Sequence, residues 1–75
     1  MRAEFYKGYT IRGFASSIGN GRFVASGGVD KNSCRVDESG EIGCYLSLEE
    51  AAAEGLSWAK DWVDAHPQDF EYQGI

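Results

Sequence analysis

Apolar residues recur along residues 48–66 at the spacing of an α-helix. They form one broad stripe at a period of about 3.6 residues, and acidic and small polar residues fall mostly on the opposite side. The stripe consists of Leu48, Ala51, Ala52, Gly55, Leu56, Ala59, Trp62, Val63 and His66. Ser47 and Glu50 form a capping box at its start, and Pro67 disfavours helical geometry in the residue before it. The pattern predicts one amphipathic helix over residues 48–66.

Gly55 lies in the middle of this apolar stripe, although glycine costs a helix about 1 kcal/mol relative to alanine. Small residues surround it on the stripe, namely Ala51, Ala52 and Ala59. We therefore expect the backbone of the helix to approach a β-sheet closely at this point, with larger side chains filling the periphery.

Upstream of Ser47 the apolar period changes from that of a helix to that of a strand. Tyr9, Ile11, Gly13 and Ala15 alternate with the residues between them, and a second alternation runs over residues 23–29, so strands are predicted over residues 4–15 and 22–30. Between these runs, Gly19-Asn20-Gly21 supplies residues that tolerate positive φ, so the two runs are predicted to form an antiparallel hairpin. A second turn at Lys31-Asn32 is expected to bring the chain back.

Two shorter strands, at residues 33–37 and 41–46, complete the predicted sheet. The expected fold class is α+β with two layers. A three- to four-stranded antiparallel β-sheet over residues 4–46 is followed by one C-terminal α-helix over residues 48–66, packed on one face of the sheet. A short tail covers residues 67–75. We expect the whole chain to form a single domain.

The two cysteines, Cys34 and Cys44, fall in the last two predicted strands. A three-residue loop at residues 38–40 would place them opposite each other, on the same apolar face as Val36 and Ile42. We expect both to be reduced, buried core residues, and a cross-strand disulfide is the alternative if the pair is a close one. Two cysteines with a distant histidine do not make a zinc site, so the sequence predicts no metal.

Composition indicates a small globular protein. The chain has 75 residues, of which 43% are hydrophobic and 13% aromatic, and this is sufficient for one compact core. No apolar run approaches the roughly 18 residues of a membrane span, and the first ten residues lack the order of a secretory signal. We therefore expect a cytoplasmic protein with no membrane partner.

Charge divides the chain into two unlike halves. Residues 1–36 carry six basic and two acidic side chains, a net charge of +4. Residues 37–75 carry one lysine and ten acidic side chains, a net charge of −9. The simplest interpretation is a basic sheet beside an acidic helix, and a separate anion-binding face is the alternative.

Catalytic chemistry has few candidates in this sequence. His66 is the single histidine, and it lies in the last turn of the predicted helix, where a histidine commonly pairs with free carbonyl groups. Ser47 serves as a helix cap, and no serine has a histidine and an acid as plausible partners. The sequence therefore predicts no enzyme activity, no catalytic residue and no cofactor.

One helix can shield only one face of a sheet, so the other face is a candidate partner surface. Six aromatic, apolar or basic residues are expected there: Tyr6, Arg12, Phe14, Val24, Arg35 and Tyr45. We predict that this face contacts a protein partner or a second copy of the chain, as a homodimer. The alternatives are that residues 69–72 of the tail cover it, or that it stacks on single-stranded nucleic acid. The acidity of the chain argues against nucleic acid.

Three short motifs within residues 21–60 carry a family resemblance. They are Gly21-Arg22-Phe23-Val24-Ala25-Ser26, Gly43-Cys44 and Ser47-Leu48-Glu49-Glu50-Ala51-Ala52. Together they resemble the hairpin, the Gly-Cys step and the helix start of HicB-like antitoxins. The resemblance implies a small cytoplasmic domain that neutralises an RNA-cleaving toxin, usually as an oligomer. The DNA-binding segment of that family has no counterpart in this chain.

The sequence is also similar to short bacterial α+β proteins of unassigned function. The leading hypothesis is therefore a non-enzymatic protein-interaction module whose cellular role the residues do not specify. A HicB-like antitoxin and a single-strand nucleic-acid binder are the two alternatives.

Overall fold

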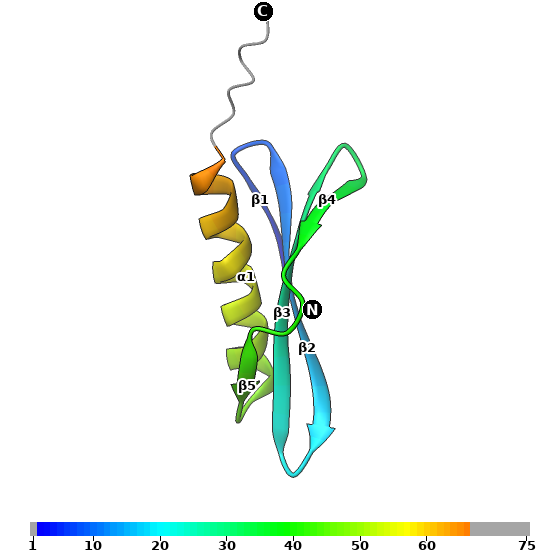
Figure 1. Ribbon diagram of the computed structural model, residues 1–75, viewed down its shortest axis with the longest axis vertical. Coiled ribbons are helices and arrows are strands. Elements are labelled where there is room, and N and C mark those ends of the chain that lie inside the picture. Colours follow the sequence, from blue (N-terminus) through cyan, green and yellow to red (C-terminus); the bar gives the residue numbers. More distant parts are fainter. Residues whose placement is uncertain (1, 67–75) are drawn as a thin grey trace, which may run out of the picture.

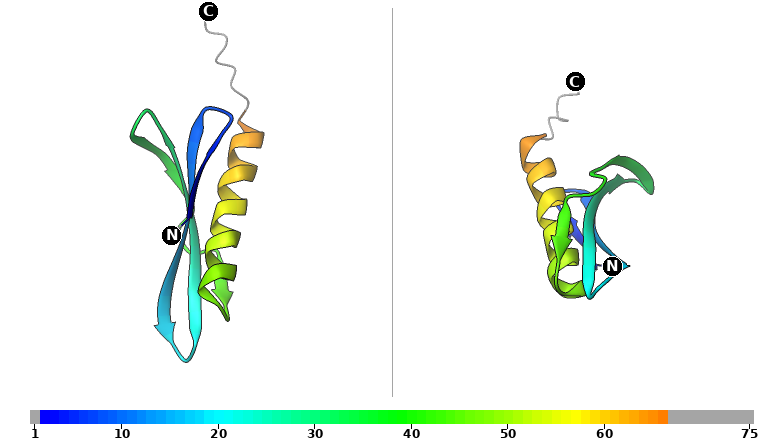
Figure 2. Two further views of the ribbon diagram at one scale, coloured as in Figure 1. Left: turned by 180° about the vertical axis from the view of Figure 1, so that it is seen from behind. Right: turned by 60° about the horizontal axis from the view of Figure 1, so that its bottom comes forward.

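A computed structural model describes residues 2–66 of the chain (Figure 1). This part contains β1 (Arg2–Tyr6), β2 (Tyr9–Gly19), β3 (Arg22–Lys31), β4 (Cys34–Glu38), β5 (Gly43–Tyr45) and α1 (Leu48–Ala65). The strands pair antiparallel in the order β1-β2-β3-β4, and β5 also pairs with β3. Figure 2 shows α1 lying along one side of the sheet. The predicted α+β class with one C-terminal helix is confirmed, and the predicted tail lies outside the described residues.

Tight turns connect the first three strands. Lys7 and Gly8 have φ values of 52° and 89°, the left-handed geometry of a two-residue hairpin turn between β1 and β2. The prediction of one continuous strand over residues 4–15 is therefore wrong, because the chain reverses direction at this turn. The predicted turn at residues 19–21 is confirmed, since β2 and β3 pair across it.

β4 and β5 lie along the same edge of β3 and do not pair with each other. Between them, the backbone N–H of Ser39 donates to the carbonyl oxygen of Gly27 at 2.9 Å, and the N–H of Ile42 donates to that of Ala25 at 2.8 Å. The N–H of Gly27 in turn donates to Oγ of Ser39 at 2.7 Å. The segment thus stays on β3, so the predicted hairpin with a loop at residues 38–40 is wrong.

The two cysteines consequently lie apart along this edge. Cys34 is opposite Lys31, near the end of β3, and Cys44 is opposite Val24, near its start. Both cysteines are free and exposed. The prediction that they face each other in the core is wrong, because it assumes a chain reversal at residues 38–40, where the backbone instead continues along its neighbour.

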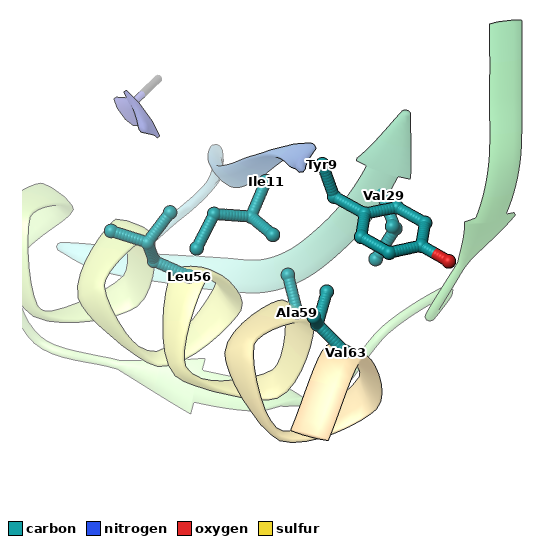
Figure 3. Close-up of a cluster of buried hydrophobic side chains, with 6 residues drawn as sticks. All are labelled: Tyr9, Ile11, Val29, Leu56, Ala59 and Val63. Carbon is teal, nitrogen blue, oxygen red and sulfur yellow. The ribbon is translucent and has the colours of Figure 1, made fainter. Parts of the chain in front are cut away.

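The core lies between α1 and the covered face of the sheet (Figure 3). Its main cluster of buried side chains consists of Tyr9, Ile11, Val29, Leu56, Ala59 and Val63. Tyr6, Trp58 and Trp62 are partly buried and pack against this cluster. Alternate residues of β2 and β3 and one side of α1 therefore supply the core, as the two apolar periods of the sequence predict.

Glycines let the backbone of α1 lie directly on the sheet. A Cβ atom on Gly55 would lie 2.0 Å from the carbonyl oxygen of Ser26, and one on Gly13 would lie 2.0 Å from that of Ala52. A Cβ atom on Gly27 would lie 2.4 Å from the carbonyl oxygen of Gly55. A larger residue would collide with backbone atoms, which cannot turn away as a flexible side chain can. The predicted close approach at Gly55 is confirmed.

The helix begins where its cap was expected. The Oγ atom of Ser47 accepts the backbone N–H of Glu50 at 3.0 Å. The helix ends at Ala65, one residue before the predicted end. The ring of His66 then stacks on that of Trp62 with the centroids 3.8 Å apart, and Nδ1 of His66 lies 2.7 Å from the carbonyl oxygen of Trp62. His66 is thus engaged with the last turn of the helix.

Candidate interaction surface

Alternate residues of β2, β3 and β4 form the sheet face that α1 leaves uncovered. Strand register places Arg12 opposite Gly28 and Arg35 opposite Asp30, and these residues share that face. We call it the open face, and its residues are Thr10, Arg12, Phe14, Ser16, Val24, Ser26, Gly28, Asp30, Arg35, Glu38 and Cys44. Four of the six predicted surface residues lie on it: Arg12, Phe14, Val24 and Arg35.

Tyr6 and Tyr45 lie on the covered side of the sheet, so their predicted placement is wrong. Tyr6 pairs with Tyr9, and its hydroxyl donates to Oδ1 of Asp64 on α1 at 2.9 Å. Tyr45 pairs with Phe23 on the covered side of β3. The chain reversal between β1 and β2 places Tyr6 on the covered side of the sheet. The pairing of β5 with β3 does the same for Tyr45.

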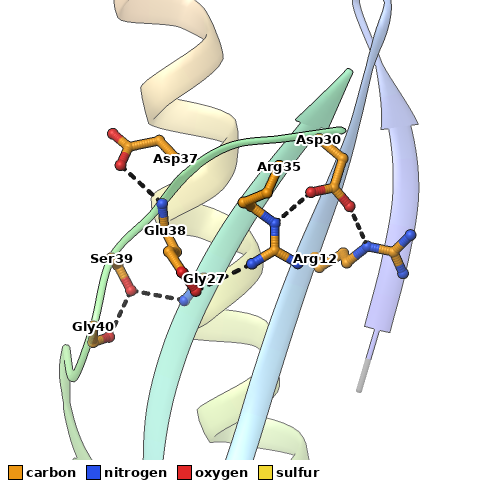
Figure 4. Close-up of polar contacts among 8 residues, drawn as sticks. All are labelled: Arg12, Gly27, Asp30, Arg35, Asp37, Glu38, Ser39 and Gly40. Atoms are coloured by element: carbon orange, nitrogen blue, oxygen red, sulfur yellow. Dashed lines mark hydrogen bonds and ion pairs between the residues drawn. The ribbon is translucent and has the colours of Figure 1, made fainter. Parts of the chain in front are cut away.

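Asp30 is the centre of an ion-pair network on the open face (Figure 4). Its carboxylate accepts a hydrogen bond from Nε of Arg12 at 2.6 Å and another from Nε of Arg35. Nη1 of Arg35 also donates to Oε1 of Glu38 at 3.1 Å. Asp30 is only 9% exposed, so the two guanidinium groups supply the partners that a nearly buried carboxylate requires.

The network shifts the pKa values of two of its members. The hydrogen bond from Arg12 is the largest cause that lowers the pKa of Asp30, the bond from Arg35 acts in the same direction, and burial opposes them. The hydrogen bond to Asp30 likewise raises the pKa of Arg35. Because two arginines face the carboxylates of Asp30 and Glu38, the formal charge of the network is balanced.

Arg35 also covers the centre of the open face. Its guanidinium carbon lies 5.9 Å from the ring centroid of Phe14, within the range of a cation–π contact. A Cβ atom on Gly28 would lie 3.2 Å from that guanidinium group and 3.3 Å from the ring of Phe14, so the missing side chain lets both groups lie close to β3. The surface that results mixes partly buried apolar groups with paired charges.

Phe5 is a surface residue that the sequence pattern missed. It is 86% exposed, and its pairing with Thr10 places it at the β1 border of the open face. Beside it lies a shallow depression of about 190 Å³, lined by Ala3, Glu4, Phe5 and Thr10. The Lys7-Gly8 pair is the sequence feature that could have predicted the position of Phe5. A turn at this pair places Phe5 on the open side of the sheet, whereas a continuous strand would place it on the covered side.

Two further kinds of site are absent from the described part of the chain. Within residues 2–66, no group of three or more histidine, cysteine, aspartate or glutamate side chains could hold a metal ion. In the same part of the chain, no helix is both long and apolar enough to cross a membrane. The groups of the open face can make apolar contacts and hydrogen bonds.

These features define a small α+β protein in which α1 covers one face of the sheet and not the other. Residues 1–73 match the family described as Domain of unknown function (DUF6566), and the chain belongs to that family. No curated protein and no solved structure matches the chain. The family description gives no activity or partner, and it contains no link to HicB-like antitoxins. A functional proposal must therefore rest on the surface itself.

Proposed function

We propose that the protein is a non-enzymatic protein-interaction module that binds its partner through the open face. The observation that supports this is the composition of that face, where partly buried Phe14 and Val24 lie beside the balanced network around Asp30. Protein interfaces combine apolar contact area with polar groups that have found partners. Another protein can cover a face of this kind without burying a charge that lacks a partner.

The proposed site of action is the cytoplasm of a bacterium. Cys34 and Cys44 are both free and exposed, which suits a reducing compartment. The bacterial source belongs to the same proposal, and it follows from the sequence resemblance alone.

A HicB-like antitoxin is the second candidate function. Exposed acidic side chains follow one another along the outer side of α1: Glu49, Glu50, Glu54 and Asp61. Such a surface attracts a basic partner, and an RNA-cleaving toxin needs basic groups to hold its substrate. Capture of a small basic ribonuclease by the wild-type chain, and its loss from a Glu54→Lys variant, would favour this candidate.

Single-stranded nucleic acid has less support as a partner. The Nε atoms of Arg12 and Arg35 already bind Asp30, and Arg35 also binds Glu38, so these groups are engaged within the protein. Phe14 lies beneath Arg35 instead of presenting a clear ring face to a base. Retention on immobilised single-stranded RNA that falls steeply as salt rises would favour this candidate instead.

Co-purification from the native cell, followed by quantitative mass spectrometry, tests the main proposal. We expect a Val24→Glu variant to lose its protein partner, because the new charge lies on the open face but outside the Asp30 network. Ser57→Glu makes a comparable change on the exposed surface of α1 and serves as the matched control. Circular dichroism would confirm that both variants fold. A partner that both variants retain equally would overturn the proposal.

A further inference from the structure

β1 is an outer strand whose free edge presents a defined set of backbone groups. It pairs with β2, and no strand within residues 2–66 lies on its other side. In a two-residue hairpin the pair that flanks the turn, here Tyr6 with Tyr9, is hydrogen bonded, and such pairs then alternate along the strands. By this alternation, the N–H and C=O groups of Ala3 and Phe5 point away from β2 and are available to another strand.

The charges on β1 are complementary to those of a second copy of β1. Proteins usually place charge on exposed edges to prevent strand pairing. Here Arg2 and Glu4 have opposite signs and are separated by one residue. If a second copy pairs antiparallel with Ala3 opposite Ala3, each Arg2 lies opposite the Glu4 of the other copy. The two-fold symmetry therefore produces two cross-strand pairs of opposite charge, which stabilise a strand pair.

Other symmetric registers that use the same backbone groups lack this match. A register centred on Glu4 sets the two Glu4 side chains against each other, and like charges directly opposite destabilise a strand pair. A register centred on Phe5 places Glu4 opposite Tyr6 and leaves its charge without a counterpart. Charge thus selects the register centred on Ala3.

The apolar residues of β1 fit the same register. Ala3 and Phe5 share the open side of β1, and the small side chain of Ala3 borders the depression of about 190 Å³. In the register centred on Ala3, Phe5 is the diagonal neighbour of Ala3 in the other copy, within reach of an aromatic ring. Pairing would therefore cover two Phe5 rings that are each 86% exposed in the single chain.

We propose that two copies of the chain pair antiparallel through β1, with Ala3 opposite Ala3, and form a homodimer with one continuous sheet. This partner is a second copy of the same chain, and its contact surface is the edge of β1 instead of the centre of the open face. The proposal goes beyond the interaction module described above, since either surface can bind while the other does not.

A charge exchange on the full chain tests the proposal. We expect Arg2→Glu and Glu4→Arg, each alone, to weaken the dimer about tenfold, because each sets like charges opposite in both cross-strand pairs. An equimolar mixture of the two variants should recover a heterodimer, since every pair then has opposite signs. The double variant that exchanges both charges should dimerise like the wild type. Sedimentation equilibrium over a range of concentrations measures all four samples, and circular dichroism confirms their folding.

The results that would overturn the proposal are equally specific. A wild-type chain that stays monomeric at the highest soluble concentration would do so, as would dimers that none of the charge variants weakens. A dimer that Val24→Glu abolishes, and that Arg2→Glu leaves intact, would show that two copies meet through the open face instead. A monomer whose Ala3 and Phe5 amides are protected from hydrogen exchange would show that another segment of the same chain covers the edge.

Discussion

Asp30 connects the three strands that form the open face. It lies on β3 and binds Arg12 on β2 and Arg35 on β4, so one carboxylate joins residues that are distant in the sequence. Its pKa in the folded chain lies below the ordinary value, first because of the hydrogen bond from Arg12. The resulting stabilisation is fully present above the unfolded pKa of about 4 and is lost as the pH falls through the lower, folded pKa.

We expect Asp30→Asn to lower the free energy of unfolding by about 1 to 2 kcal/mol at neutral pH, because it removes the charge that both arginines bind while they remain partly exposed. The variant should also lose stability less steeply than the wild type below about pH 4. Urea unfolding at a series of pH values measures both effects. Glu38→Gln, at an exposed member of the same network, is the control and should change stability little. If the free energies of unfolding of the wild type and of Asp30→Asn fall in parallel as the pH is lowered, Asp30 is not a source of the pH dependence and the prediction is contradicted.

For single residues, the sequence predicts which types of side chain lie on the surface better than it predicts where each of them lies. Arg12, Phe14, Val24 and Arg35 lie on the open face because regular alternation holds along β2, β3 and the start of β4. The pairing of Asp30 with two arginines could not be predicted, since it depends on the register between three strands. That register is set by contacts across the sheet and not by neighbours along the chain.

The spacing between α1 and the sheet depends on glycine, and Gly55 tests it most directly. Alanine at this position gains about 1 kcal/mol of helix propensity, but its Cβ would lie 2.0 Å from the carbonyl oxygen of Ser26. We therefore expect Gly55→Ala to lower the free energy of unfolding by about 2 kcal/mol or more, because the helix must shift away from the sheet. Urea unfolding followed by far-ultraviolet circular dichroism measures the change.

Gly43→Ala provides the matched control for this substitution. Gly43 has no positive φ, and a Cβ atom there would lie 3.4 Å from the hydroxyl oxygen of Tyr45, an ordinary contact distance. We expect its stability to stay within about 0.5 kcal/mol of the wild type. A Gly55→Ala variant as stable as Gly43→Ala would show that the helix does not rest on the backbone of β3.

Helix ends and turns that are marked by neighbouring residues could be predicted from the sequence. Strands whose position depends on pairing with a segment distant in the sequence could not. The start of α1 follows from the cap at Ser47, and the turn between β2 and β3 follows from Gly19-Asn20-Gly21. The turn at Lys7-Gly8 was missed because lysine is not a typical residue for positive φ. The placement of β5 was missed because alternation alone does not distinguish a hairpin from two segments on one neighbouring strand.

In the whole molecule, the C-terminal half of α1 is tied to strands from both ends of the sheet. Asp64 accepts hydrogen bonds from the hydroxyl of Tyr6 at 2.9 Å and from Nζ of Lys7 at 3.0 Å, at the turn between β1 and β2. Nε1 of Trp62 donates to Oδ2 of Asp37 on β4 at 2.8 Å. The helix therefore connects the first and the fourth strand as well as covering the two between them.

These connections imply that helix and sheet unfold together. Most of the stability of a helix in a protein comes from the packing of its apolar face, so α1 should lose its structure when the sheet does. In urea we expect the circular dichroism of the helix and the fluorescence of Trp62, isolated by Trp58→Phe, to follow one transition. If β1 pairs as proposed, the urea concentration at the midpoint of unfolding should also rise with protein concentration, because unfolding then separates two copies. A helical signal that persists after the fluorescence of Trp62 has changed would contradict this coupling, since α1 would then be stable without the sheet.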